Sequence, residues 1–252
     1  MKLSIIISTL NIAKTLQRCL DSLAVQNYKN IELILIDGGS NDGTVEIIKN
    51  NSSIIAHYIS EKDNGIYDAW NKGVLLAKGD WIYFIGGDDK LFEESTISKI
   101  IHQLKILPEE AMIVYGSILA TKSDGHSKTY GKAWNEISEN MNSFMCIPHQ
   151  GVFHSSKLVK KYGFDSNLKI AGDYKLIMQS LKYAQPIFLD DIIVANQNVY
   201  GVSALRKNRM KTIEEFRKVQ SELGIPMTFK WLCEYFKSVV WKVLSYFLDV
   251  KA

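Results

Sequence analysis

The stretch GDWIYFIGGDD ends a run of apolar, strand-forming residues with two glycines and then two adjacent carboxylates, Asp88 and Asp89. Two like charges side by side repel each other, so a positive partner is expected there. Magnesium and manganese bind one or two carboxylates and complete their coordination with water and phosphate oxygens. The pair therefore predicts a divalent-cation site whose further ligand is a diphosphate, with an exposed acidic turn as the alternative.

Similar polar clusters follow three other apolar segments. Thr9 and Asn11 follow SIII, Asp37 ends IELILID, and Asp63 lies in SEKDNG after HYIS. If one aspartate of the GGDD pair holds a metal, its neighbour can accept hydrogen bonds from a ribose, while Asp37 or Asp63 accepts one from a base. Such an assembly would bind a nucleoside diphosphate. The alternative is that the glycines and polar residues only form turns and helix caps.

The segments that position these clusters alternate between two patterns. Short, nearly continuous apolar runs alternate with stretches, such as 13–27 and 67–77, whose apolar residues recur at helical spacing. This alternation indicates an α/β fold with a mainly parallel central sheet and helices on both faces. Ligands of such sheets bind beyond the carboxyl ends of the strands. Every polar cluster falls on this edge of the sheet, which we call the rim.

Composition, charge and cysteine content narrow the function. Of the 252 residues, 46% are hydrophobic and 23% charged, which predicts one large soluble domain or one domain with an appendage. The net charge of +3 gives no reason to expect a nucleic-acid partner. Cys19, Cys146 and Cys233 form no CxxC pair, so disulfides and structural zinc are not expected and a reducing compartment fits. Ser4 and Ser8 interrupt the first apolar run, which is interpreted as a buried strand rather than a signal peptide.

Five motifs together resemble a known enzyme family. SIIISTLN, IELILIDGGSNDGT, SEKDNGIYDAWNKG, GDWIYFIGGDD and GDYKLIMQ stand in the order and spacing of the family 2 glycosyltransferases, over roughly residues 1–205. The resemblance implies the GT-A type fold and an inverting, metal-dependent transfer that uses Mn²⁺ or Mg²⁺. It also implies a nucleotide-diphospho-sugar donor, with a UDP-sugar expected, and a saccharide or lipid-linked acceptor in bacterial surface polysaccharide synthesis.

The resemblance also assigns residues by position. Those that would contact the nucleotide-sugar or its metal are Thr9, Asn11, Asp37, Asp63, Asp88 and Asp89. Among them, Asp89 would bind the metal, Asp88 would lie near the ribose, and Asp63 near the base. Many members carry two acidic residues where this chain has Asp37 and Gly38. The identity of the base and its contacts are therefore left open.

An inverting transfer needs a general base that removes the proton of the acceptor hydroxyl. Asp173, in AGDYKLIMQ, stands where the family places this base. The alternative is that Asp173 only caps the helix that follows. A non-catalytic nucleotide-sugar-binding module would need no such base. A sugar nucleotidyltransferase should carry a glycine-rich, basic loop after the first strand, which STLNIAKT does not resemble.

Two further segments have a functional and a structural interpretation. CIPHQGVFHSS alternates like a strand, which places His149 and His154 on opposite faces, so that only one reaches the cleft. His149 would then contact the acceptor or the metal, or serve as a structural histidine. The loop YGVSALRKNR contains Arg206, whose guanidinium suits a diphosphate. Such a loop would close over the donor, and an exposed basic helix start is the alternative.

We expect residues 1–224 to form the catalytic domain and residues 225–252 an amphipathic helical tail. In FKWLCEYFKSVVWKVLSYFL the polar residues form a narrow stripe at helical spacing, and four of them are charged, which argues against a membrane-spanning helix. Three roles remain for this helix: docking on the catalytic domain, a homodimer seam, or a membrane interface. Trp231, Trp241 and the lysines favour the last. We therefore expect a cytoplasmic protein, at the inner face of the cytoplasmic membrane if its acceptor is lipid-linked.

Overall fold

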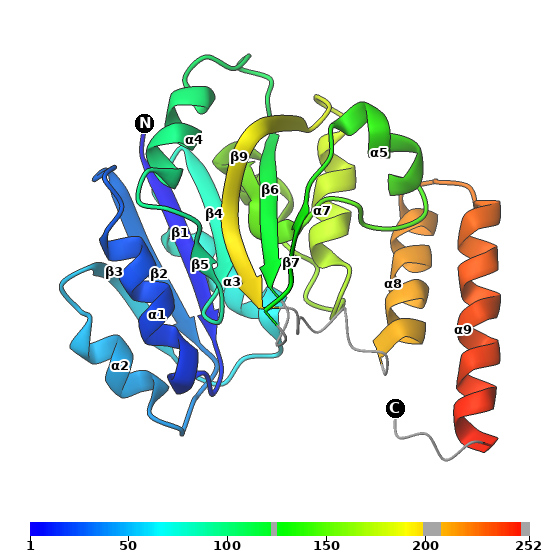
Figure 1. Cartoon of the computed structure of the whole chain (residues 1–252), viewed down its shortest axis with the longest axis horizontal. Helices are drawn as coiled ribbons and strands as arrows, with labels where there is room; N and C mark the ends of the chain where they lie inside the picture. Colours follow the sequence, from blue (N-terminus) through cyan, green and yellow to red (C-terminus); the bar gives the residue numbers. More distant parts are fainter. Residues whose placement is uncertain (122–124, 199–207, 248–252) are drawn as a thin grey trace.

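The structure is a computed structural model that describes residues 1–121, 125–198 and 208–247. Within these residues, a nine-stranded sheet in the order β3-β2-β1-β4-β8-β6-β9-β5, with β7 beside β6, forms the centre of the molecule (Figure 1). The strands are β1 (Leu3–Thr9), β2 (Ile31–Asp37), β3 (Ile55–Ser60), β4 (Trp81–Gly86), β5 (Lys90–Leu91), β6 (Ile113–Thr121), β7 (Ser127–Tyr130), β8 (Val152–Ser155) and β9 (Ile187–Asn198).

Helices connect and cover these strands. They are α1 (Ala13–Ala24), α2 (Thr44–Asn50), α3 (Ile66–Leu76), α4 (Thr96–Leu104), α5 (Trp134–Met141), α6 (Ser156–Tyr162), α7 (Gly172–Ser180), α8 (Arg209–Glu222) and α9 (Phe229–Phe247), with a short 3₁₀ turn, η1 (His149–Gly151). Strands β1, β2, β3, β4, β6 and β9 run in one direction, and β5, β7 and β8 run in the other. The expectation of a mainly parallel sheet is confirmed.

The two faces of the sheet carry separate hydrophobic layers. In β1, Ile5 and Ile7 pack with residues of α1, α2 and α4, whereas Ile6 packs with residues of α3, α6 and α7. Helix α3 lies directly on β1, because a Cβ atom at Gly73 would stand only 2.6 Å from the Cγ2 atom of Ile6. Burial on both faces explains why the strand sequences are continuously apolar.

The C-terminal helices extend the face that α3 covers. Helix α8 buries Phe216 and Val219 in the core, and α9 packs along the outer side of α8, at the edge of the molecule (Figure 1). Trp231 of α9 donates a hydrogen bond of 3.1 Å from Nε1 to the carbonyl of Ile213 on α8. No helix in the described part of the chain has the length and apolar character needed to cross a bilayer.

Candidate functional site

The carboxyl ends of β1, β2 and β3 meet at Asp37. Its side chain is fully buried and accepts hydrogen bonds from Thr9 Oγ1 at 2.9 Å, Ser60 Oγ at 2.7 Å, and the Gly39 and Ser40 amides at 3.1 and 2.9 Å. Burial acts to raise the pKa of Asp37, but these hydrogen bonds, those from Ser40 above all, lower it below its usual range. The carboxylate is therefore ionised, and its hydrogen bonds hold the loop that follows β2.

Asn11 fixes the neighbouring loop after β1. It has a φ of 51°, the left-handed conformation, which among non-glycine residues asparagine adopts most readily. Its N–H donates to Ser40 Oγ at 2.8 Å, and its Oδ1 accepts from the Asn41 N–H at 3.0 Å. The loops after β1 and β2 are thus joined to each other through Asn11.

Asp63 lies above the same loop. Its Oδ1 accepts a hydrogen bond of 2.9 Å from the Gly65 N–H, and among the described residues no donor reaches Oδ2. A Cβ atom at Gly38 would stand 2.6 Å from that Oδ2 atom. The missing side chain at Gly38 therefore leaves room for the carboxylate of Asp63, which occupies the place beside Asp37 where an acidic residue at position 38 would begin.

Asp88 and Asp89 lie in the turn that follows β4. A Cβ atom at Gly86 would stand 2.6 Å from Asp88 Oδ1 and 3.2 Å from Asp89 Oδ2, so both carboxylates bend back toward the same glycine. Asp89 is buried, and its N–H closes the turn by donating to the Gly86 carbonyl at 3.0 Å. Arg18 of α1 donates to the Asp88 carbonyl at 2.5 Å. This turn presents two carboxylates at one point on the rim.

The donor set of this turn fits Mn²⁺ or Mg²⁺. Within the described residues, no group of three acidic, histidine or cysteine side chains forms a complete metal cage. These cations do not need such a cage, because they bind through one or two carboxylates and take further oxygens from water and phosphates. Burial, and then Asp89 and Asp88, raise the pKa of the Cys19 thiol behind the turn.

Asp173 is the second residue of α7 and faces Tyr67 in the first turn of α3. Its Oδ1 accepts hydrogen bonds from Tyr67 Oη at 3.2 Å and from the Tyr174 N–H at 2.8 Å. A Cβ atom at Gly172 would stand 2.8 Å from the Tyr67 ring, so the ring packs directly on the glycine. Burial, and then the charge of Asp173, raise the pKa of Tyr67 well above its usual range, which keeps the phenol protonated as a donor.

Glu215 of α8, which no sequence motif indicates, holds the segment that leads into α7. Its carboxylate accepts hydrogen bonds from the N–H groups of Lys169, Ile170 and Ala171 at 3.0, 2.7 and 3.0 Å. Lys169 Nζ donates in turn to the Asn64 carbonyl at 2.5 Å, which ties this segment to the loop of Asp63. Glu215 is 44 residues from Ala171, and no local pattern distinguishes it from other acidic residues on a helix surface.

The prediction that His149 and His154 point to opposite faces was wrong. Their ring centroids lie 5.2 Å apart, because the η1 turn interrupts the strand alternation between them. His149 stacks on Trp70 at 4.8 Å, and His154 lies edge-on to Phe84 at 5.4 Å. Burial lowers the pKa of both histidines, and that of His154 falls furthest. The pair forms a neutral aromatic cluster beneath the rim.

Arg206 lies outside the described residues. The residue that begins α8, Arg209, donates from Nη2 to Glu234 Oε2 on α9 at 2.7 Å. That guanidinium therefore joins the two C-terminal helices.

Comparison with known proteins gives a consistent result. Residues 4–164 match the model of the family described as Glycosyl transferase family 2. The PGL/p-HBAD biosynthesis glycosyltransferase of Mycobacterium bovis (strain BCG / Pasteur 1173P2) is 31% identical over 242 residues, which make up 90% of this chain and 90% of that protein. Glycosyltransferase GlyA of Streptococcus pneumoniae is 28% identical over 249 residues, which are 92% of this chain and 32% of that protein.

Solved structures share the fold. The mannosyltransferase PcManGT from Pyrobaculum calidifontis, in complex with GDP-Man and Mn²⁺, superposes with a TM-score of 0.71 at 13% identity, covering 100% of this chain and 76% of that one. S. aureus TarS 1-349 in complex with UDP-GlcNAc gives a TM-score of 0.70 at 16% identity with the same coverage. The GT-A type fold that the motifs predicted is confirmed.

Proposed function

Because the chain belongs to glycosyl transferase family 2 and is a glycosyltransferase, we propose that it moves a sugar from a nucleotide-diphospho-sugar to an acceptor hydroxyl, with inversion and with a divalent cation. The observation that carries the proposal is the convergence of the Asp88 and Asp89 carboxylates on Gly86. We propose a UDP-sugar as donor, since the TarS structure of the same fold is a complex with UDP-GlcNAc. A guanosine diphosphate sugar is the second candidate, because PcManGT is in complex with GDP-Man.

On the donor side, we assign Asp89 to a Mn²⁺ or Mg²⁺ ion and Asp88 to the ribose. When bound, the cation would stabilise the negative charge that develops on the leaving diphosphate. Asp63 is the proposed acceptor for the base, since its Oδ2 atom takes no hydrogen bond from the described residues. Thr9, Asn11 and Asp37 belong to the same nucleotide site, where they hold the loops after β1 and β2; Arg206 is proposed to contact the diphosphate.

On the acceptor side, Asp173 is the proposed general base. Its carboxylate takes the proton of the acceptor hydroxyl as that oxygen forms a bond to the anomeric carbon. The bond from the same carbon to the diphosphate oxygen breaks, and the nucleoside diphosphate leaves from the opposite face of the sugar. Tyr67 fixes the orientation of the base through its 3.2 Å hydrogen bond, and Glu215 holds the start of α7.

We further propose a saccharide or lipid-linked acceptor and a cytoplasmic location at the inner membrane face. A role in bacterial surface polysaccharide synthesis is proposed as well; the relative from M. bovis is named as a PGL/p-HBAD biosynthesis glycosyltransferase.

The experiment that tests the donor site is thermal unfolding with a panel of nucleoside diphosphates and nucleotide sugars, each with and without Mn²⁺. A ligand that binds only the folded chain, at about 100 times its Kd, stabilises it by about 2.7 kcal/mol. For a domain of this size that is a rise in Tm of roughly 5–10 °C. We expect such a rise for one base, dependent on Mn²⁺ and lost in Asp89→Ala.

The control is Asp80→Ala, which removes an aspartate at the opposite end of β4 and should leave the Mn²⁺-dependent rise intact. A rise that persists in Asp89→Ala would reject the metal assignment. No rise with any nucleotide would reject the donor class.

A further inference from the structure

Helix α9 turns its apolar side to the solvent. Phe229 is 80% exposed, Phe236 58%, Val240 55% and Leu244 46%, whereas Trp231 and Ser238 are buried. The four exposed residues follow each other at intervals of seven, four and four positions, which places them on one side of the helix. A helix that docks on a globular domain normally buries this side, so the orientation of α9 is the reverse of the usual one.

The contacts between α9 and α8 hold this orientation. Trp231 donates a hydrogen bond to the backbone carbonyl of Ile213, and Arg209 of α8 forms an ion pair with Glu234 of α9 at 2.7 Å. Ser238 donates to the Glu234 carbonyl within the same buried side. The buried side of α9 thus packs on α8, and α9 lies beside α8 at the edge of the molecule (Figure 1).

Charge indicates what covers the apolar side. Lys237 follows Phe236 at the border of this side and is 66% exposed. The segment 208–247 carries a net charge of +3, equal to that of the whole chain, from Arg209, Lys211, Arg217, Lys218, Lys230, Lys237 and Lys242 against Glu214, Glu215, Glu222 and Glu234. Exposed aromatic and aliphatic residues beside lysines are the signature of a helix that lies in the interface of an anionic bilayer.

A second copy of the chain fits this side less well. An isologous contact through α9 would bring Lys237 of both copies to the same seam. The acidic residue nearest to that seam, Glu234, already binds Arg209 and Lys237, each at 2.7 Å. Because Arg209 and Lys237 share this one carboxylate, each copy would bring a net positive charge to the seam, whereas phosphate head groups would neutralise it.

We propose that the α9 face formed by Phe229, Phe236, Val240 and Leu244 inserts into the head-group region of an anionic lipid surface. This inference does not depend on the assignments of the donor site. It places the enzyme on a membrane through one helix that lies in the interface.

The test is co-sedimentation of the full chain with vesicles of phosphatidylcholine, with and without added phosphatidylglycerol. We expect binding to the anionic vesicles, weakened by salt. In the double variant Phe236→Glu, Val240→Glu, binding should fall at least about tenfold, because two apolar side chains no longer insert. Lys237→Gln should weaken binding about fivefold, as removal of one basic residue near an anionic surface does.

The matched control is Leu75→Glu, which places the same charge at an 86% exposed leucine on α3, and it should bind vesicles as the wild type does. All variants should keep the wild-type Tm and nucleotide response, since the substituted residues are exposed. Failure of the wild type to bind anionic vesicles would overturn the proposal. So would a dimer in sedimentation velocity that the Phe236→Glu, Val240→Glu variant dissociates, because a second copy would then cover the face.

Discussion

Strand β2 carries a buried carboxylate near each end, Glu32 near its start and Asp37 at its last residue. Each faces a hydroxyl of β1 at the paired position: Ser4 donates to Glu32 Oε1 at 2.5 Å, and Thr9 donates to Asp37 Oδ1 at 2.9 Å. Burial acts to raise the pKa of both acids, and their hydrogen bonds lower it below the usual range. The two ends of one strand pair therefore use the same local arrangement.

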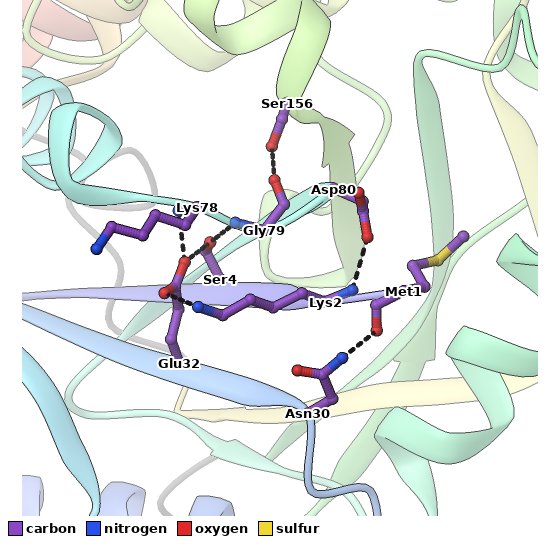
Figure 2. A network of polar contacts seen from close by, with 9 residues as sticks. All are labelled: Met1, Lys2, Ser4, Asn30, Glu32, Lys78, Gly79, Asp80 and Ser156. Atoms are coloured by element: carbon purple, nitrogen blue, oxygen red, sulfur yellow. Dashed lines mark hydrogen bonds and ion pairs between the residues drawn. The ribbon is translucent and has the colours of Figure 1, made fainter.

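The two carboxylates differ in their charged partners. Glu32 forms an ion pair with Lys2 and also binds the Lys78 N–H, within a network that includes Gly79 (Figure 2). Asp37 receives only uncharged donors, and no lysine or arginine of the described chain forms an ion pair with it. At the amino end of the sheet Lys2 compensates the charge of Glu32, while the carboxyl end keeps negative charge that a divalent cation can complement.

The largest difference between the carboxyl and amino ends of the sheet should appear in turnover, which depends on Asp173 on the carboxyl side. We expect Asp173→Asn to lower kcat by about 10²–10⁴, the usual contribution of a general base. Donor binding should persist, because no donor contact is assigned to this residue. Initial rates with the donor found by thermal unfolding measure the first effect, and the donor-dependent rise in Tm measures the second. Unchanged turnover in a folded Asp173→Asn variant would exclude Asp173 as the base.

A side chain at position 38 should displace the Asp63 carboxylate at the carboxyl end of the sheet. Gly38→Ala brings a Cβ atom to 2.6 Å from Asp63 Oδ2, so the carboxylate has to move. We expect donor affinity to fall by about tenfold to a hundredfold, the range of one lost hydrogen bond to a charged group. Titration calorimetry measures it.

The control for Gly38→Ala is a double-mutant cycle with Asp63→Asn. If the glycine acts only by making room for Asp63, the two losses should not add. Additive losses would show that Gly38 serves the donor independently of Asp63.

The residues at the carboxyl ends of the strands could be predicted from the sequence. The residues that hold them in place could not. Parallel strands bring their carboxyl ends to one edge, so local patterns were enough to group Thr9, Asp37, Asp63 and Asp89. The contact between Tyr67 and Asp173 joins residues 106 positions apart. No periodicity encodes such a pairing, because it depends on how α3 and α7 pack.

The wrong orientation predicted for His149 and His154 and the placement left open for α9 have the same physical origin. The alternation around His149 and His154 predicts opposite faces only if the strand is continuous, and a single 3₁₀ turn removes that condition. The period of α9 fixes which residues share a side, but the rotation of the helix about its axis is set by Trp231 and Glu234 against α8. Local patterns define faces, and tertiary contacts decide where the faces point.

Removal of the hydrogen bond from Tyr67 to Asp173 should reduce turnover less than removal of the Asp173 charge itself. Tyr67→Phe removes the hydroxyl that binds Asp173 while the ring can still pack on Gly172. We expect kcat to fall about tenfold, corresponding to one hydrogen bond to a charged group, with little change in the donor KM. Tyr58→Phe, at a 46% exposed tyrosine of β3, is the control and should have no effect. A tenfold rise in the donor KM would show that Tyr67 serves the donor rather than the base.

The amino end should affect stability and leave catalysis unchanged. Glu32→Gln removes the charge that pairs with Lys2, and we expect a loss of about 1–2 kcal/mol at neutral pH, or roughly 2–8 °C in Tm. The kcat of the folded fraction should stay the same. Glu109→Gln, which breaks an exposed pair with Lys157, should change Tm little.

The pH dependence of Glu32→Gln provides a second check. Since the folded pKa of Glu32 is lowered, its charged form stabilises the fold above the unfolded pKa of about 4.3, and this stabilisation is lost as the pH falls through the folded pKa. The difference in Tm between wild type and variant should therefore shrink below about pH 4.3. A difference that stays constant into acid would mean that Glu32 acts through packing, and the contrast in charge between the two ends of β2 would fail.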